Sequence, residues 1–214
     1  SGGATCPSLL LEPSRTNLMI QSEAFSTSTW SLTNATLTAN NTTSPEGLVN
    51  AYKLTENTAN STHRITQTSS TSSGQVYTQS IFAKDDGSGR FLRMFRGSGT
   101  YNVGVFNLTT GVIESQSGSN LISADIVPYT NGWYKCSITF TAQFSNIASY
   151  IALQNGSSDS YTGDGTSGIY IYGASLELGS YPTSYIPTYG VSQTRAVDVC
   201  VGAGDSSTFN SSEG

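Results

Sequence analysis

The side chains that could do covalent chemistry do not form a catalytic pattern in this chain. The only histidine is His63, which lies in the alternating polar and apolar segment 62–67, and the sequence contains no Gly-x-Ser-x-Gly motif. A hydrolytic triad requires a nucleophile, a base and an orienting group that act together. No phosphate-binding or dinucleotide-binding glycine motif is found either. The sequence therefore predicts a protein that is not an enzyme.

Carboxylates are the other groups that could do chemistry, because glycoside hydrolysis uses two of them across a cleft. The chain has 14 acidic residues, and most lie in turn-like segments. Asp159 and Asp164 share one loop and resemble a catalytic pair only by their spacing. Catalytic carboxylates need burial to shift their pKa values, so a solvated or cation-binding loop is the favoured interpretation of this segment.

The charge composition excludes two classes of partner. Among 214 residues there are 9 Lys and Arg against 14 Asp and Glu, which gives a formal net charge of −5. Nucleic acids and anionic membrane surfaces attract basic proteins, so we expect neither as a partner. No apolar run reaches the length of a membrane span, so we expect no membrane insertion. Neutral or weakly charged glycans remain compatible with this surface.

Three cysteines stand far apart, at positions 6, 136 and 200. An odd number argues against a disulfide framework. Cys136 alternates with Tyr134 and Ile138, and we predict a buried free thiol. Cys6 and Cys200 flank the patterned region, and a bridge between them stays open because it depends on geometry.

Apolar and polar residues alternate with a period of two along much of the sequence. We therefore expect strands to be the elements that position a binding site. Segments 75–84, 134–141 and 150–154 alternate apolar and polar residues, as half-buried antiparallel strands do. Turn signals separate them at short intervals, and Asn131-Gly132 is the strongest hairpin signal. Roughly ten to twelve strands at this spacing predict an all-β, antiparallel, two-sheet β-sandwich of the jelly-roll type.

Four segments support a more specific interpretation. They are SLLLEPSRTNL (residues 8–18), QVYTQSIFAK (75–84), NGWYKCSITFT (131–141) and the region 161–199, which contains YGASLELGSYPTSYIPT. Together they resemble the carbohydrate-binding-module-like jelly-roll domains of bacteriophage tail-fibre and other structural proteins. The resemblance extends over residues 8–198, so we expect one domain over residues 1–200. Residues 201–214 are rich in Gly and Ser and are expected to lead to a neighbouring domain.

Alternation along the strands predicts a candidate glycan-binding surface. If Ile81, Leu92 and Ile151 face the core, their neighbours face outward and form aromatic and polar stripes on the open face of a sheet. The candidate carbohydrate-binding residues are Phe82, Arg93, Phe95, Tyr150 and Gln154. The loop 157–167, with Tyr161, is an alternative location because loops often carry recognition. A third alternative is that this face packs on another subunit.

The resemblance also implies a structural calcium ion, because carbohydrate-binding jelly rolls often hold one between the N-terminal segment and the last strand. Calcium prefers oxygen ligands. The candidate metal ligands in this chain are Glu23, Asp164 and Glu177, and the oxygen-rich loop 159–166 supports the expectation.

Two functions of different kinds follow from these observations. The first is a non-catalytic glycan-binding module of a phage appendage or of a secreted polysaccharide-active protein, located on the virion surface or outside the cell. The second is a structural spacer or oligomerisation domain of a phage fibre or capsid decoration without a ligand, with homo-oligomers such as trimers formed through the parent protein.

Overall fold

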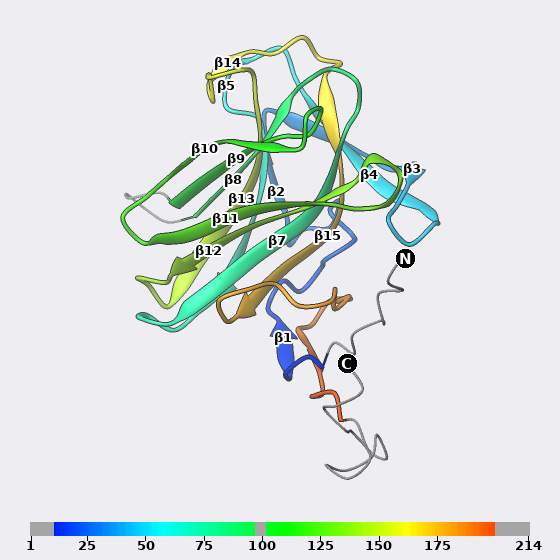
Figure 1. Ribbon diagram of the computed structural model, residues 1–214. Helices are drawn as coiled ribbons and strands as arrows, with labels where there is room; N and C mark the ends of the chain where they lie inside the picture. Colours follow the sequence, from blue (N-terminus) through cyan, green and yellow to red (C-terminus); the bar gives the residue numbers. More distant parts are fainter. Residues whose placement is uncertain (1–10, 97–101, 200–214) are drawn as a thin grey trace, which may run out of the picture.

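Strand alternation builds two antiparallel sheets that pack face to face (Figure 1). The computed structural model describes residues 11–96 and 102–199. Cys6, Cys200, the turn at Ser98-Gly99 and the segment 201–214 therefore lie outside the described residues. The predicted jelly-roll sandwich is confirmed, and sixteen strands rather than ten to twelve are found within the described ranges.

Sheet I has six strands in the order β10-β9-β8-β13-β6-β2. Their bounds are Val112–Ser117 (β10), Asn102–Asn107 (β9), Phe91–Arg96 (β8), Asn146–Gln154 (β13), Arg64–Ser70 (β6) and Ser31–Thr33 (β2). The two central strands β8 and β13 pair over six residues, from Ser149 opposite Arg96 to Gln154 opposite Phe91. This register decides which side chains share the outward face of the sheet.

Sheet II also has six strands, in the order β11-β12-β7-β15-β4-β3. Their bounds are Leu121–Pro128 (β11), Tyr134–Thr141 (β12), Val76–Asp85 (β7), Gly168–Leu178 (β15), Val49–Glu56 (β4) and Ala35–Thr43 (β3). Two short pairs complete the fold. They are β1 (Arg15–Asn17) with β16 (Gln193–Arg195), and β5 (Asn60–Ser61) with β14 (Tyr161–Thr162).

The core lies between the inward faces of the two sheets. It contains Leu92, Met94, Ile151 and Leu153 from sheet I, and Ile81 and Ala83 from sheet II, as the alternation predicts. The buried free thiol of Cys136 is confirmed, and burial raises its pKa well above the usual range. Trp30 and Trp133 are also buried, at 3% and 1% exposed.

The predicted turn at Asn131-Gly132 connects two neighbouring strands. Asn131 and Gly132 both adopt positive φ angles between β11 and β12, in a short 3₁₀ turn (Thr130–Gly132). Asparagine and glycine tolerate this left-handed conformation better than other residues, so the hairpin closes without strain. The described residues include no helix with the length and apolar character needed to cross a membrane.

Part of the outward face of sheet II is covered by the chain itself. After β15, the segment 180–188 runs over this face, where Lys135 donates to the carbonyl oxygen of Thr183 at 2.6 Å and Thr183 donates to Glu177 at 2.5 Å. Arg195 forms an ion pair with Glu12, at 2.5 Å. The C-terminal part of the described chain lies beside β1 (Figure 1), and the segment 180–188 covers the part of the outward face around Lys135, Phe82 and Tyr172.

Candidate functional site

The outward face of sheet I carries a regular array of aromatic and polar side chains. Alternate residues of β8 face outward, and their direct partners on β13 are known from the register. Phe91 lies opposite Gln154, Arg93 opposite Ala152, and Phe95 opposite Tyr150. Val103 and Val105 of β9 extend the array on one side, opposite Phe95 and Arg93. Arg64 and Thr66 of β6 extend it on the other side, opposite Ala152 and Tyr150.

Two stacked rings form the centre of this face. The rings of Phe95 and Tyr150 have centroids 4.3 Å apart and an interplanar angle of 0°. The guanidinium carbon of Arg93 lies 4.2 Å from the centroid of the Phe95 ring, and that of Arg64 lies 5.0 Å from the centroid of Tyr150. Planar guanidinium groups are attracted to aromatic faces, so each arginine is held beside a ring.

The two arginines differ in their partners. Arg93 pairs with Asp159, at 3.2 Å, and Asp159 belongs to the loop that follows β13. None of the ion pairs found in the described part of the chain includes Arg64, and its buried Nε atom has no hydrogen-bond partner. Arg64 is therefore held beside the Tyr150 ring, whereas Arg93 also fixes the loop.

A cavity of about 410 Å³ opens at the edge of the array. It is lined by Phe91, Glu114, Ser115, Gln154, Gly156 and Ser157. This volume lies within the usual range for small-molecule sites, and the walls combine an aromatic ring with carboxylate, carboxamide and hydroxyl groups. Gln154 donates to the carbonyl oxygen of Gly156 at 2.8 Å, which ties the loop to the end of β13. We call the array and this cavity together the sheet I face.

The structure brings together four of the predicted carbohydrate-binding residues, namely Arg93, Phe95, Tyr150 and Gln154. Their predicted exposure is wrong in part, because Phe95 is only 4% exposed and Gln154 only 7% exposed. Phe95 is covered by the Tyr150 ring and by Arg93, and Gln154 by the loop it holds. Sequence reasoning missed Phe91, Arg64, Glu114 and Asp159. Alternation with Arg93 and Phe95 could have identified Phe91, but the other three depend on strand order and loop path.

Phe82 does not belong to this face, which corrects one prediction, and Tyr161, predicted for the alternative location on the loop 157–167, is buried. Phe82 lies on β7 of sheet II and is 6% exposed, because it packs against Trp133, Tyr172 and Tyr185 under the covering segment. Tyr161 is 7% exposed, and its ring packs against His63. Alternation identifies the face of a strand but not the sheet to which the strand belongs.

Tyr161 instead completes a buried network around Glu56. Its hydroxyl donates to Glu56 at 2.6 Å, Arg90 donates to both carboxylate oxygens at 2.8 Å, and the backbone N–H of Asp164 donates at 2.9 Å. Burial alone would raise the pKa of Glu56, but these hydrogen bonds outweigh it and lower the pKa. The network links the loop 161–164 to Arg90, the residue before Phe91.

The three predicted calcium ligands do not meet. Glu177 is buried and bonded to Thr183 and Ser175, whereas Glu23 accepts from the hydroxyl of Tyr185. Asp164 is exposed and caps its own loop through Thr166 and Ser167. These hydrogen bonds hold the pKa of Asp164 well below its usual range. Within residues 11–96 and 102–199, no group of three or more His, Cys, Asp or Glu residues could hold a metal ion.

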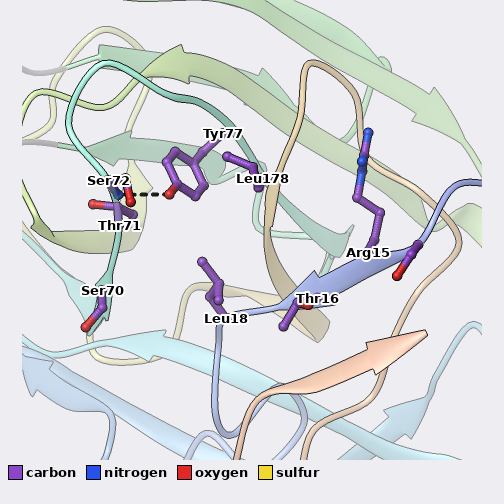
Figure 2. A pocket seen from close by; sticks show the side chains of 9 residues that line it. Arg15, Thr16, Leu18, Ser70, Thr71, Ser72, Tyr77 and Leu178 are labelled. Carbon is purple, nitrogen blue, oxygen red and sulfur yellow. Dashed lines mark hydrogen bonds between the residues drawn. The ribbon is translucent and has the colours of Figure 1, made fainter. Parts of the chain in front are cut away.

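A second cavity of about 410 Å³ lies at one end of the sandwich, near β1. Figure 2 shows Tyr77, Leu18 and Leu178 around the same space, with Ser70, Thr71 and Ser72 on one side and Arg15 on the other. The Tyr77 hydroxyl already accepts the backbone N–H of Ser72 at 2.9 Å, and Arg15 lies over the ring of Tyr181. Its lining residues include no carboxylate or carboxamide, and its polar groups are the guanidinium of Arg15 and the hydroxyls of Ser14, Thr16, Ser70, Thr71, Ser72 and Tyr77.

Comparison with known proteins finds distant structural likenesses only. No family model matches the chain, and no curated protein is similar to it in sequence. The enzymatically active domain of tailspike protein 4 from bacteriophage CBA120 is 16% identical, with a TM-score of 0.45 over 76% of this chain. A CBM22-1–GH10 fragment of endo-1,4-beta-D-xylanase 10B from Clostridium thermocellum is 12% identical, with a TM-score of 0.41 over 80% of this chain. This chain spans only 21% and 29% of those two proteins.

A third structure is matched over nearly its whole length. The CBM22-1 xylan-binding domain from Paenibacillus barcinonensis is 11% identical, with a TM-score of 0.43, and the match covers 78% of this chain and 94% of that domain. At these identities the likeness concerns the arrangement of strands and not the site.

Proposed function

We propose that this protein is a non-catalytic glycan-binding module and that the sheet I face holds the saccharide. The observation that carries the proposal is the array of Phe91, Phe95 and Tyr150 beside a cavity with hydrogen-bonding groups on a rigid sheet. Aromatic faces contact the apolar C–H surface of a sugar, and a few fixed polar groups orient its hydroxyls.

The position of the polar groups favours a saccharide over a purely apolar ligand. Glu114 and Gln154 both line the cavity, and the guanidinium of Arg64 lies beside the Tyr150 ring. Carboxylate and carboxamide groups accept and donate hydrogen bonds to vicinal hydroxyls. Each site binds weakly, and several copies on one carrier increase the avidity.

We also propose that the carrier is a phage appendage or a secreted polysaccharide-active protein. The resemblance of residues 8–18 and 161–199 to phage structural domains supports this context. The low charge of the chain is compatible with adsorption to neutral cell-surface polysaccharide. The alternative, a spacer without a ligand, would place the sheet I face against another subunit.

Affinity gel electrophoresis against bacterial and algal polysaccharides tests the proposal. The variants are Phe91→Ala and Tyr150→Ala, both half-buried residues whose loss leaves the core intact. The matched controls are Tyr129→Ala on the other side of the sandwich and Leu178→Ala in the end cavity. Retardation that the two site variants lose and the two controls keep supports the proposal.

Other outcomes contradict it. Binding lost only in Leu178→Ala would move the saccharide to the end cavity. Failure to bind any polysaccharide, together with a stable oligomer in sedimentation analysis, would favour the spacer function.

A further inference from the structure

Arg96 is a fully buried arginine at the end of β8, and it has no acidic partner. Its side chain faces inward, and the residue is 0% exposed. None of the ion pairs formed within the described ranges includes Arg96. A buried charge is costly unless an opposite charge or a full set of hydrogen bonds compensates it.

Neutral groups satisfy only part of this guanidinium. Nε donates to Oε1 of Gln79 at 2.8 Å, and Nη2 donates to the hydroxyl of Ser149. The ring of Phe140 lies 5.0 Å from the guanidinium carbon, which adds a cation–π contact. Nη1 has no hydrogen-bond partner, and the amide Nε2 of the bonded Gln79 has none either. Nη1 of Arg96 is a donor, so the partner that would satisfy it is an acceptor.

A small cavity lies next to the unpartnered donor. It has a volume of about 10 Å³ and is lined by Arg96, Asn102, Phe140, Thr141, Gln143, Phe144 and Ile147. A volume of this size holds about one water-sized species. The lining contains no carboxylate, and Oδ1 of Asn102 is already occupied by the backbone N–H of Asn120. The lining therefore provides the guanidinium of Arg96, a hydroxyl group, two carboxamides and apolar side chains, but no negative charge.

We propose that this cavity binds a single small monovalent anion, with chloride as the first candidate, through Nη1 of Arg96. A water molecule would satisfy the hydrogen bond but would leave the guanidinium charge uncompensated. A space for about one water-sized species favours a monatomic halide over a polyatomic anion such as sulfate.

Electrostatics agree with this assignment. Burial lowers the pKa of Arg96 to about 9, so the side chain stays protonated at neutral pH. A bound anion would stabilise that protonated form. This site is independent of the proposed glycan function, because Arg96 faces inward while the sheet I face is on the opposite side of β8.

Calorimetry at constant ionic strength tests the proposal, with sodium gluconate replaced stepwise by sodium chloride or sodium bromide. Only the folded state holds the anion, so Tm is expected to rise with halide concentration, by about 3 °C for each tenfold increase near saturation. Arg96→Met preserves side-chain volume and should lose the halide dependence. Arg15→Met, an arginine that also carries an unpartnered Nε, should keep it.

A bromide-soaked crystal of the unmodified protein gives a second test that does not depend on any variant folding. An anomalous peak within hydrogen-bonding distance of Arg96 Nη1 is the expected result. A water molecule at that position without bromide, or an equal halide dependence in the wild type and Arg96→Met, would overturn the proposal.

Discussion

Phe95 on β8 and Tyr150 on β13 are direct cross-strand partners, and their rings stack in parallel with centroids 4.3 Å apart. The pair sits on the outward face of sheet I, and Arg93 and Arg64 cover its two ends. Stacked aromatic pairs contribute about 0.5–1.5 kcal/mol beyond the area that they bury. The same pair therefore stabilises the sheet and provides the platform of the candidate site.

Removal of the Phe95 ring and removal of the Tyr150 ring should have different effects on unfolding free energy and on glycan affinity. Phe95 is nearly inaccessible, so Phe95→Ala should cost about 3 kcal/mol of unfolding free energy, as buried phenylalanines do. Tyr150 is half-buried, and Tyr150→Ala should cost less while it reduces glycan affinity at least about tenfold, or about 1.4 kcal/mol. Urea unfolding and titration calorimetry on the two variants measure both quantities. Equal loss of stability in both variants would contradict this division of roles.

We predict that the ion pair between Arg93 and Asp159 restricts the motion of the loop 155–160 but contributes little to the unfolding free energy. Asp159 is half-exposed, and pairs of this kind contribute about 0–1 kcal/mol. Asp159→Asn should therefore change Tm little, but it should increase hydrogen–deuterium exchange in the loop 155–160. Ser158→Ala in the same loop, which keeps Asp159, is the control. Unchanged exchange in Asp159→Asn would show that the loop is held by other contacts.

The Glu56 network predicts a dependence of stability on pH. The pKa of Glu56 is below its ordinary value of 4.5 in the folded state, because hydrogen bonds from Arg90, Tyr161 and Asp164 favour the carboxylate over the effect of burial. Its contribution is therefore present above about pH 4.5 and is lost as the pH falls through the lowered folded value. Glu56→Gln should unfold at a lower temperature at pH 7 and should show a smaller fall in Tm between pH 6 and about pH 3.

Other carboxylates keep some acid sensitivity in that variant. Desolvation opposes the shifts of Glu12 and Asp86, yet their hydrogen bonds also lower their pKa values. Glu46→Gln, at a surface turn, is a matched control that should leave the pH profile unchanged. A Glu56→Gln profile parallel to that of the wild type would argue against the network as a source of acid sensitivity.

Gly168 permits the close approach of β15 to β4. A Cβ atom at this position would lie 2.1 Å from the backbone oxygen of Leu54, which cannot move without breaking the sheet. Gly168→Ala should therefore lose about 3 kcal/mol or more of unfolding free energy, which is at or above the upper end of the loss that an overpacked core side chain causes. Gly87→Ala, in a turn with positive φ and open space, should lose only about 1 kcal/mol. Chemical denaturation measures the unfolding free energy of both variants. It thereby compares the cost of a steric clash in Gly168→Ala with the cost of a positive φ angle in Gly87→Ala.

Much of the fold could be predicted from sequence because alternation is a local property. The inward faces of segments 75–84, 134–141 and 150–154, the hairpin at Asn131-Gly132 and the buried thiol of Cys136 follow from neighbours in the chain. Strand order is not local, since paired residues of β8 and β13, such as Arg96 and Ser149, are more than fifty positions apart in sequence yet lie side by side. This is why Phe82 was assigned to the wrong surface and Arg64 was missed.

The exposed fraction of a side chain was also harder to predict than the face of the sheet to which it points. Phe95 and Gln154 face outward as expected, but side chains from adjacent strands and a loop cover them. Tyr161 was expected on a recognition loop, and its hydroxyl instead satisfies the buried carboxylate of Glu56. A buried acid between β4 and a distant loop has no signal in a local pattern, so only the tertiary structure identifies it.

The most direct measurement for the central claim is a nitrogen-15 NMR titration of the protein with an oligosaccharide taken from the polysaccharide that binds best. We predict that backbone shifts concentrate at residues 64–66, 91–95, 114–115 and 150–159, on the sheet I face. Shifts confined to residues 14–18, 70–72 and 178 would place the saccharide in the end cavity. That result, or the absence of any saturable shift with every oligosaccharide tried, would contradict the account.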